Sequence, residues 1–322
     1  MTIFDATPYL KEIARGKHGG RDLNRDQARA LFGAIFAGEV HDLAIGAVLA
    51  AMRIKGETVE ELAGMMEALA PHVLPLRVPA RRAMTLLIPT YNGARKLPNL
   101  VPLLALLLSR EGIPVVLHGM SQEPRRVGTF EILEQLGHRP VATLVEAGNR
   151  LDQHHLAVVP LPVLSPALAR LLDLRRTLGV RNSGHTLAKL LLPAGLAPSQ
   201  AARLVAVTHP DFQALMRDYF ATAPANIFLM RGVEGEPVVR LHAPQPIEFI
   251  GLDGLPVSLM LEEGEAGYPL PVRDAHATAQ WTAAVLEGRE RVPRALARQV
   301  AHLAEHCRKG AAPPSLRLVS NK

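Results

Sequence analysis

Basic side chains crowd the stretch between positions 170 and 203, in which Asp173 is the only acidic residue. The basic residues are Arg170, Arg175, Arg176, Arg181, Lys189 and Arg203. Arginine presents a planar fork of N–H donors and lysine a compact ammonium, and both groups bind phosphate oxygens. Leu187 and Leu190 supply an apolar face, so the segment can pack while its cations stay presented. The pattern indicates a polyanion site, although many basic runs are only solvated helix faces.

Two further basic pairs follow apolar runs and are expected to lie on loops. Arg95 and Lys96 end one loop, and Arg125 and Arg126 lie on another. Both pairs are further candidates for phosphate contacts. We predict phosphate contacts from the following residues: Arg95, Lys96, Arg125, Arg126, Arg170, Arg175, Arg176, Arg181, Lys189 and Arg203.

The elements that must position these residues begin with a helical module over residues 5–74. Asn24 with Gln27, and Thr58 with Glu61, have the spacing of capping boxes and precede runs rich in Ala, Leu and Met. Glycines punctuate these runs, and no strand pattern interrupts them. The sequence predicts four short helices here.

After residue 80, short apolar runs alternate with helical patterns. The expected strands are Met84–Ile88, Pro114–His118, Leu156–Val159, Leu204–Val207, Asn226–Met230 and Pro246–Ile250. The expected helices are 97–110, 127–136, 165–178, 184–192, 211–221, 275–287 and 293–309. This alternation predicts an α/β fold with a mostly parallel central sheet flanked by helices, joined to a small all-helical N-terminal domain. We expect the helical domain to comprise 1–75 with part of 160–190, and the α/β domain 80–160 and 190–322.

Composition limits the class of protein. The 322 residues are 48% apolar, enough for a substantial core, and the formal charge is +6. The pI of 9.8 permits contact with nucleic acid without requiring it. The charge is uneven: positions 77–96 hold five basic residues and no acid, whereas positions 231–265 hold two basic residues and seven acids. A basic patch and an acidic patch are therefore expected.

Other classes are disfavoured by the sequence. The single cysteine, Cys307, allows no internal disulfide, and the apolar run 97–108 is too short for a membrane span. The N-terminus lacks a signal-peptide pattern, so we expect a cytoplasmic protein. Two histidine pairs have metal-like spacing without matching ligands: His154 with His155 and His302 with His306. We predict neither a metal nor a cofactor.

Several motifs resemble the anthranilate phosphoribosyltransferase family. They are Leu117-His118-Gly119, Gly128–Gly137, Leu178-Gly-Val-Arg-Asn182, Leu191-Leu-Pro-Ala194 and Val207-Thr-His-Pro210. The resemblance covers nearly the whole chain and implies the fold of those enzymes. It also implies a homodimer joined through the helical domains. The same resemblance implies a substrate cleft in which Arg95 and Lys96 line the wall that faces the basic cluster, and which the loop of Arg125 and Arg126 meets. His118 matches a residue of the family's substrate loop, but no partner that would orient it as a general base is evident.

The same resemblance fails at the catalytic signatures. The enzymes carry a Gly-Thr-Gly-Gly-Asp-Gly loop for the sugar pyrophosphate, but positions 89–96 read Pro-Thr-Tyr-Asn-Gly-Ala-Arg-Lys, in which only Gly93 remains. Their adjacent Asp-Glu pair for magnesium appears as Glu234-Gly235-Glu236, which spoils the known geometry. These departures resemble a non-enzymatic branch of the family, the YbiB-type DNA-binding proteins. We therefore expect a protein that is not an enzyme.

The expected partner is DNA, and possibly RNA. Aromatic residues are only 4% of the chain, and Tyr91 is the sole aromatic residue expected near the groove, so we predict backbone binding with little sequence preference. One alternative is an active phosphoribosyltransferase or nucleoside phosphorylase using phosphoribosyl pyrophosphate. Another is a dimer whose basic patch meets an acidic protein.

Overall fold

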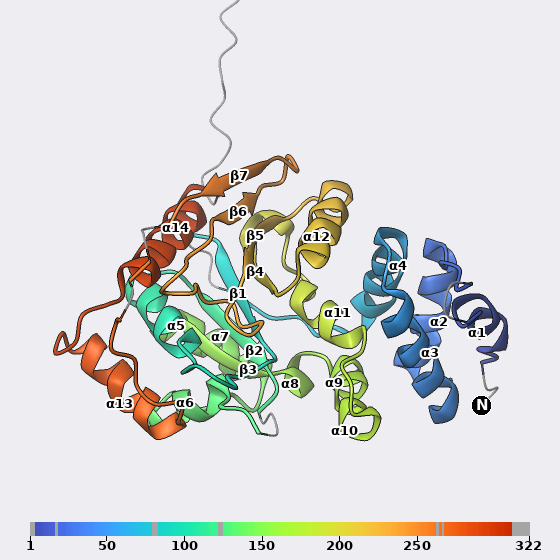
Figure 1. The fold of residues 1–322 in the computed structure, drawn as a ribbon, viewed down its shortest axis with the longest axis horizontal. Coiled ribbons are helices and arrows are strands. Elements are labelled where there is room, and N and C mark those ends of the chain that lie inside the picture. Colours follow the sequence, from blue (N-terminus) through green and yellow to red (C-terminus); the bar gives the residue numbers. More distant parts are fainter. Residues whose placement is uncertain are drawn as a thin grey trace, which may run out of the picture.

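The helical domain lies at one end of the molecule, beside a larger α/β domain (Figure 1). The computed structural model describes residues 4–16, 19–78, 83–121, 125–261, 264–265 and 267–310. The helical domain is built from α1 (Thr7–Ile13), α2 (Arg25–Ala37), α3 (Asp42–Lys55), α4 (Val59–Leu69) and the short 3-10 helix η1 (Ala70–His72). Both expected capping boxes are present, at the starts of α2 and α4. The four predicted helices are confirmed.

The α/β domain is organised around one sheet of seven strands. They are β1 (Thr85–Thr90), β2 (Val115–Gly119), β3 (Leu156–Pro160), β4 (Ala201–Val207), β5 (Asn226–Arg231), β6 (Ile247–Ile250) and β7 (Pro256–Leu259). Their order is β3-β2-β1-β4-β5-β6-β7, parallel from β3 to β5 and antiparallel for the last two pairs. The six predicted strands and the mostly parallel sheet are confirmed; β7 was not predicted.

Helices cover both faces of the sheet. Their bounds are α5 (Val101–Arg110), α6 (Thr129–Gln135), α7 (Leu144–His154), α8 (Leu161–Leu164), α9 (Pro166–Asp173), α10 (Arg175–Leu178), α11 (Gly184–Leu190), α12 (Pro210–Thr222), α13 (Ala275–Leu286) and α14 (Arg294–Gly310), with the 3-10 helix η2 (Pro198–Gln200). Apolar residues of α5, α6 and α14 share one core with one face of the strands. Those of α7, α8, α11 and α12 share a second core with the other face and with the helical domain.

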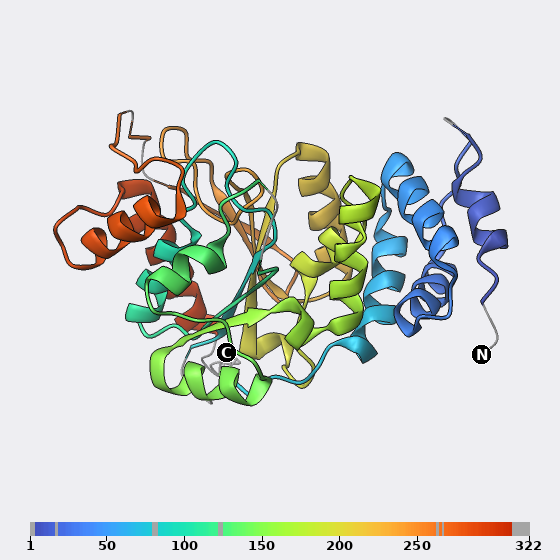
Figure 2. The same cartoon turned by 90° about the horizontal axis from the view of Figure 1, so that it is seen from below.

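The second core joins the two domains. In Figure 2 the helical domain, in blue, stands beside the yellow-green helices α9 to α11, while α13 lies at the opposite end. Helix α4 contacts both α11 and α12. The exact division of the chain between domains stays a prediction. None of the described helices is long and apolar enough to cross a membrane.

The side on which the chain adds its next strand changes between β1 and β4, at the centre of the sheet. From β1 the chain moves outward to β2 and β3, then returns to β4 on the other side of β1. The carboxyl ends of β1 and β4 therefore lie side by side, and the loops that follow them diverge. In open α/β sheets, ligands bind at such a point.

Candidate functional site

A cavity of about 540 Å³ opens at this edge of the sheet, between the two domains. Its walls come from the end of α3, the loop after β1, helix α11, the loop after β4 and the start of α12. The lining includes Arg53, Lys55, Glu57, Arg181, His185, Lys189 and His209. The cavity thus gathers charged side chains from segments far apart in the sequence.

Arg181 and Lys189 supply the cationic wall of this cavity. Lys189 Nζ donates a hydrogen bond to the main-chain carbonyl of Ala206 at 2.5 Å. Burial, and then the neighbouring charge of Arg181, lower the pKa of Lys189 to about 8. Burial, reinforced by Arg181, also lowers the pKa of His185 to about 3, so that imidazole is neutral near pH 7. Two like charges held together in a cleft favour an anion that relieves their repulsion.

The wall from α3 is partly neutralised. Lys55 Nζ lies 2.8 Å from an oxygen of Asp22 and 2.7 Å from an oxygen of Glu61, so its charge is paired inside the helical domain. Arg53 Nη1 donates to the main-chain carbonyl of Arg181 at 3.1 Å and links α3 to the basic wall. Burial raises the pKa of the Glu57 carboxyl. Among the described residues of the lining, Glu57 carries the one carboxyl group. The shift of its pKa favours the neutral form.

The loop after β1 is closed by a carboxylate of the chain itself. Glu236 is buried, and its Oε1 accepts the main-chain N–H groups of Asn92 at 2.7 Å and Gly93 at 2.8 Å. Its Oε2 accepts the hydroxyl of Thr90 at 2.6 Å. Gly235 approaches so closely, with φ 89°, that a Cβ there would lie 2.7 Å from Asn92 Nδ2. Both carboxylate oxygens of Glu236 are therefore used to hold the loop.

A second carboxylate closes the rest of the loop. Glu234 accepts the main-chain N–H of Arg95 at 2.7 Å and of Lys96 at 3.0 Å. Partial burial opposes ionisation of Glu234, but these N–H bonds and the charge of Arg126 bring its pKa below the ordinary value. The N–H of Ala94 is bonded to Val127. Every N–H from position 92 to 96 is thus bonded within the chain.

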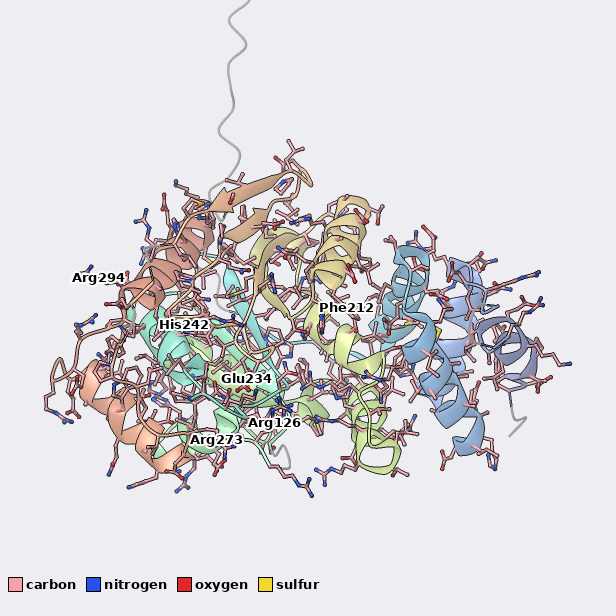
Figure 3. The ribbon with its side chains drawn as sticks, viewed as in Figure 1. Arg126, Phe212, Glu234, His242, Arg273 and Arg294 are labelled. Carbon is pink, nitrogen blue, oxygen red and sulfur yellow. The ribbon has the colours of Figure 1, made fainter. Side chains whose placement is uncertain are left out.

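The basic side chains of the loops lie outside the cavity. Arg95 and Lys96 are exposed and are not part of its lining, which corrects the expectation that they form its facing wall. Arg126 Nη1 donates to the carbonyl of Gly93 at 3.2 Å, and Arg125 is exposed with φ 65°. Figure 3 shows Arg126 and Glu234 next to each other on the α/β domain, away from Phe212. Arg95 and Lys96 thus belong to the loop after β1, and Arg126 is bonded to it.

The structure also corrects two residues of the predicted basic cluster. Arg203, on β4, donates to the carbonyl of Leu190 at 2.5 Å and lies over the ring of Phe220. Burial lowers its pKa to about 10. Arg170 Nη2 donates to the carbonyls of Ile35 and Phe36, both at 3.1 Å, at the end of α2. Both guanidinium groups stabilise the fold and do not line the cavity.

The remaining cluster residues lie on α10, near the cavity but not in its lining. Arg176 is exposed and pairs with Asp173 at 2.7 Å. Arg175 is half-buried, and its charge contributes to the low pKa of His185. All ten residues of the predicted set are among the described residues, and of these ten only Arg181 and Lys189 line the cavity.

Two aromatic residues line the cavity: Tyr91, which was expected near the groove, and Phe212, which was not. Tyr91 is 2% exposed, and its hydroxyl is bonded to His118 Nδ1 at 2.7 Å. His118 is buried as well, and this burial lowers its pKa to about 3, so the imidazole is neutral near pH 7. Phe212, in the first turn of α12, lines the cavity and is 38% exposed. The sequence analysis missed Phe212; the only signal was an aromatic residue close after His209-Pro210, at the start of the predicted helix.

No group of three His, Cys, Asp or Glu side chains among the described residues is placed to hold a metal ion. His302 bonds the carbonyl of Met260 at 2.7 Å, and His306 packs against Phe249. The side chains of His302 and His306 therefore contact other parts of the fold.

Comparison with known proteins agrees with the fold. The helical bundle domain of the glycosyl transferase family matches residues 7–72. Anthranilate phosphoribosyltransferase of Thermus thermophilus superposes with a TM-score of 0.74 at 24% identity, covering 94% of this chain and 92% of that one. The enzyme of Saccharomyces cerevisiae, in complex with PRPP and Mg, gives a TM-score of 0.71 at 15% identity, covering 97% and 93%.

Two sequence relatives are similar over different lengths of the chain. Anthranilate phosphoribosyltransferase of Gluconobacter oxydans is 32% identical over 195 residues, which is 60% of this chain and 52% of that enzyme. The uncharacterized protein YbiB of Escherichia coli (strain K12) is 41% identical over 298 residues, 92% of each chain. With this similarity along nearly its whole length, and with the fold described above, the chain belongs to the anthranilate phosphoribosyltransferase-like family.

Proposed function

We propose that this protein binds nucleic acid through the phosphate backbone, without marked sequence preference, and that it is not an enzyme. The observation that carries the proposal is the contrast between two neighbouring sites. The loop after β1 has its N–H groups filled by Glu234 and Glu236. The adjacent cavity keeps Arg181 and Lys189 in its lining, with one carboxyl, Glu57, among the described residues.

The loop after β1, whose N–H groups already have acceptors, argues against transfer of a phosphoribosyl group. A pyrophosphate is held by several N–H groups that point at its oxygens, and here those groups already have acceptors. Displacing Glu236 would leave a buried carboxylate without its donors, which costs several kcal/mol. The family scaffold is retained, while this route to pyrophosphate binding is blocked.

The cationic wall supports phosphate binding. Arginine and lysine side chains bind the backbone of any sequence, and each phosphate contact releases condensed counterions. Arg181 and Lys189 form the centre of the proposed interface. Arg175, Arg176, Arg95, Lys96, Arg125 and Arg126 extend it over the surrounding surface. Arg170 and Arg203 are left out because their guanidinium groups are bonded within the fold. The proposed assembly is a homodimer joined through the helical domains, acting in the cytoplasm.

Fluorescence anisotropy with labelled DNA and RNA of two unrelated sequences tests the proposal. We expect binding to both sequences, with an affinity that falls steeply between about 50 and 300 mM salt. The double variant Arg181→Ala/Lys189→Ala should reduce the salt slope by about 1, because the phosphate that both cations contact is no longer neutralised. Arg29→Ala/Arg289→Ala is the matched control, since it removes two exposed, ion-paired arginines far from the cavity.

The outcomes separate the proposal from its rivals. Absence of nucleic-acid binding at about 50 mM salt would overturn it. Equal losses in the double variant and the control would move the interface away from the cavity. Magnesium-dependent consumption of phosphoribosyl pyrophosphate with an aromatic amine or base would establish the enzyme alternative. Salt-dependent binding to a protein but not to nucleic acid would favour the remaining alternative, a dimer whose basic patch meets an acidic protein.

A further inference from the structure

Phe212 gives the cavity an apolar surface beside its cations. Its ring belongs to the first turn of α12, and Val207 and Met216 lie with it in the lining. The side chain is 38% exposed, whereas Met216 is buried. A partly exposed aromatic ring at the mouth of a basic cavity is a surface on which a flat, uncharged group can stack.

The opposite side of the cavity suits a phosphate. Lys189 Nζ has three donors, and the described residues accept one of them, through the carbonyl of Ala206. Arg181 lies close enough to lower the pKa of Lys189. The 13-residue helix α12 also starts at this cavity, and its N-cap residue His209 makes no side-chain cap. The positive end of that helix adds to the two cations.

The depth of the cavity is limited by buried residues. Tyr91 and Asn92 form its inner wall, and behind them lie His118 and Glu236, all 2% exposed or less. The volume of about 540 Å³ is in the range of small-molecule sites, roughly 300–1,000 Å³. A pocket of this size can admit one nucleotide but not a base pair within a duplex.

We infer that the cavity takes up one unpaired nucleotide, with its base against Phe212 and its phosphate at Arg181 and Lys189. This inference rests on the proposed function and adds a preference that backbone binding alone does not give. Single strands and strand ends offer an unstacked nucleotide at little cost, whereas a closed duplex must first be opened. The base is held by stacking, which every base can provide, so the preference is for strandedness and not for sequence.

Oligonucleotides that contain 2-aminopurine test the inference, because stacking on an aromatic ring changes the fluorescence of that base. We compare a single strand with a duplex of the same length whose two ends are each closed by a polyethylene glycol linker, so that it contains no unpaired base. The Phe212→Ala variant should bind the single strand roughly five- to 150-fold more weakly, as expected for one lost stacking contact. Its affinity for the closed duplex should not change. Phe212→Tyr, which keeps a ring, should keep the single-strand affinity and the fluorescence change.

Leu255→Ala is the matched control, because Leu255 is another exposed apolar residue, 66% exposed, on the turn between β6 and β7. It should leave both affinities unchanged. If Phe212→Ala binds the single strand as well as the unaltered protein does, with the same fluorescence change, the inference is overturned while the proposed function stands. If the unaltered protein binds neither oligonucleotide at low salt, both are overturned. Thermal melting checks that each variant is folded.

Discussion

The carboxylate of Glu236 lies 2.8 Å from the main-chain N–H of Gly93, across the loop that follows the central strand β1. This bond joins the one glycine retained from the family's pyrophosphate loop to a residue of the altered acidic segment. The two departures that the sequence shows separately are therefore one structural change. The carboxylate thus accepts N–H groups of the kind that bind phosphate oxygens in other proteins.

We accordingly expect no binding of phosphoribosyl pyrophosphate. Titration calorimetry with this compound and magnesium should show no saturable heat, because the N–H groups of Asn92 and Gly93 are already bonded. An anthranilate phosphoribosyltransferase of the same fold is the positive control. Saturable, magnesium-dependent binding would show that Glu236 can be displaced, and would contradict the filled-loop argument.

Glu234→Gln should loosen the loop in a pH-dependent way. One carboxylate oxygen becomes an NH₂ group that cannot accept the N–H of Arg95 or Lys96, so we expect a loss of about 1–2 kcal/mol of unfolding free energy at pH 7. The pKa of Glu234 is lowered in the folded state from its ordinary 4.5. Its stabilisation is thus fully present above about pH 4.5 and is lost as the pH falls through the folded-state pKa.

Urea denaturation of both proteins at several pH values measures this effect. The difference between the unaltered protein and Glu234→Gln should be constant near neutrality and should vanish in acid. Glu134→Gln, at an exposed position of α6, is the control and should show a negligible difference at pH 7. A difference for Glu234→Gln that is the same at every pH would mean that the carboxylate charge is unimportant.

Arg170→Ala and Arg181→Ala should differ in whether they lower the unfolding free energy or the nucleic-acid affinity. The guanidinium of Arg170 bonds two carbonyls near the end of α2, where the last turn of a helix runs short of donors for its carbonyls. We expect the variant to lose about 1–3 kcal/mol of unfolding free energy and to keep its nucleic-acid affinity. Arg181→Ala should show the opposite pattern. Weaker binding by a folded Arg170→Ala protein would restore Arg170 to the interface.

The sequence predicted the sheet well where strands are fully buried. Leu204–Val207, for example, is a continuous apolar run, as buried parallel strands are. The edge strand β7 was missed because it starts with Pro256 and has three exposed residues, so it lacks a clear pattern. Helix α7 was missed although Thr143 caps it, because its sequence is mainly polar.

The site was harder to predict than the fold. The sequence located a dense group of cations, but it does not show where a guanidinium points. Arg203 and Arg181 look alike in the sequence, yet Arg203 is bonded to Leu190 and lies over Phe220 of α12, while Arg181 lines the cavity. Phe212 was overlooked because an aromatic residue in a predicted helix is most often a core residue. Direction and exposure depend on packing between distant segments, which spacing along the chain does not encode.

The proposed dimer makes a separate prediction. Leu43, on α3 of the helical domain, is 79% exposed, which is unusual for a leucine in a packed helical module. If the helical domains join two copies there, Leu43→Glu should shift the protein towards monomer in sedimentation velocity experiments. Leu252→Glu, at an exposed leucine of the α/β domain, should not. A monomeric unaltered protein at micromolar concentration would contradict the dimer.

Lys189→Met should stabilise the protein at pH 7 while it weakens nucleic-acid binding. Burial, followed by the charge of Arg181, lowers the pKa of Lys189 from 10.5 to about 8 in the folded state. Below about pH 8 the folded and unfolded chains both carry the charge, so folding includes the full cost of burying it. Between about pH 8 and 10.5 the folded chain releases its proton first, and this cost declines.

We therefore expect the methionine variant to gain on the order of 1 kcal/mol of unfolding free energy at pH 7, and to lose that advantage as the pH rises to about 10.5. Urea denaturation at both pH values measures the gain, with Lys309→Met, at an exposed position of α14, as the control. Reduced stability at pH 7 would show that the bond from Lys189 to Ala206 outweighs the cost of the buried charge. A stable variant with weak binding would show that Lys189 serves ligand binding and not stability. Its buried ammonium lowers the stability of the free protein and becomes favourable only when an anion binds beside it.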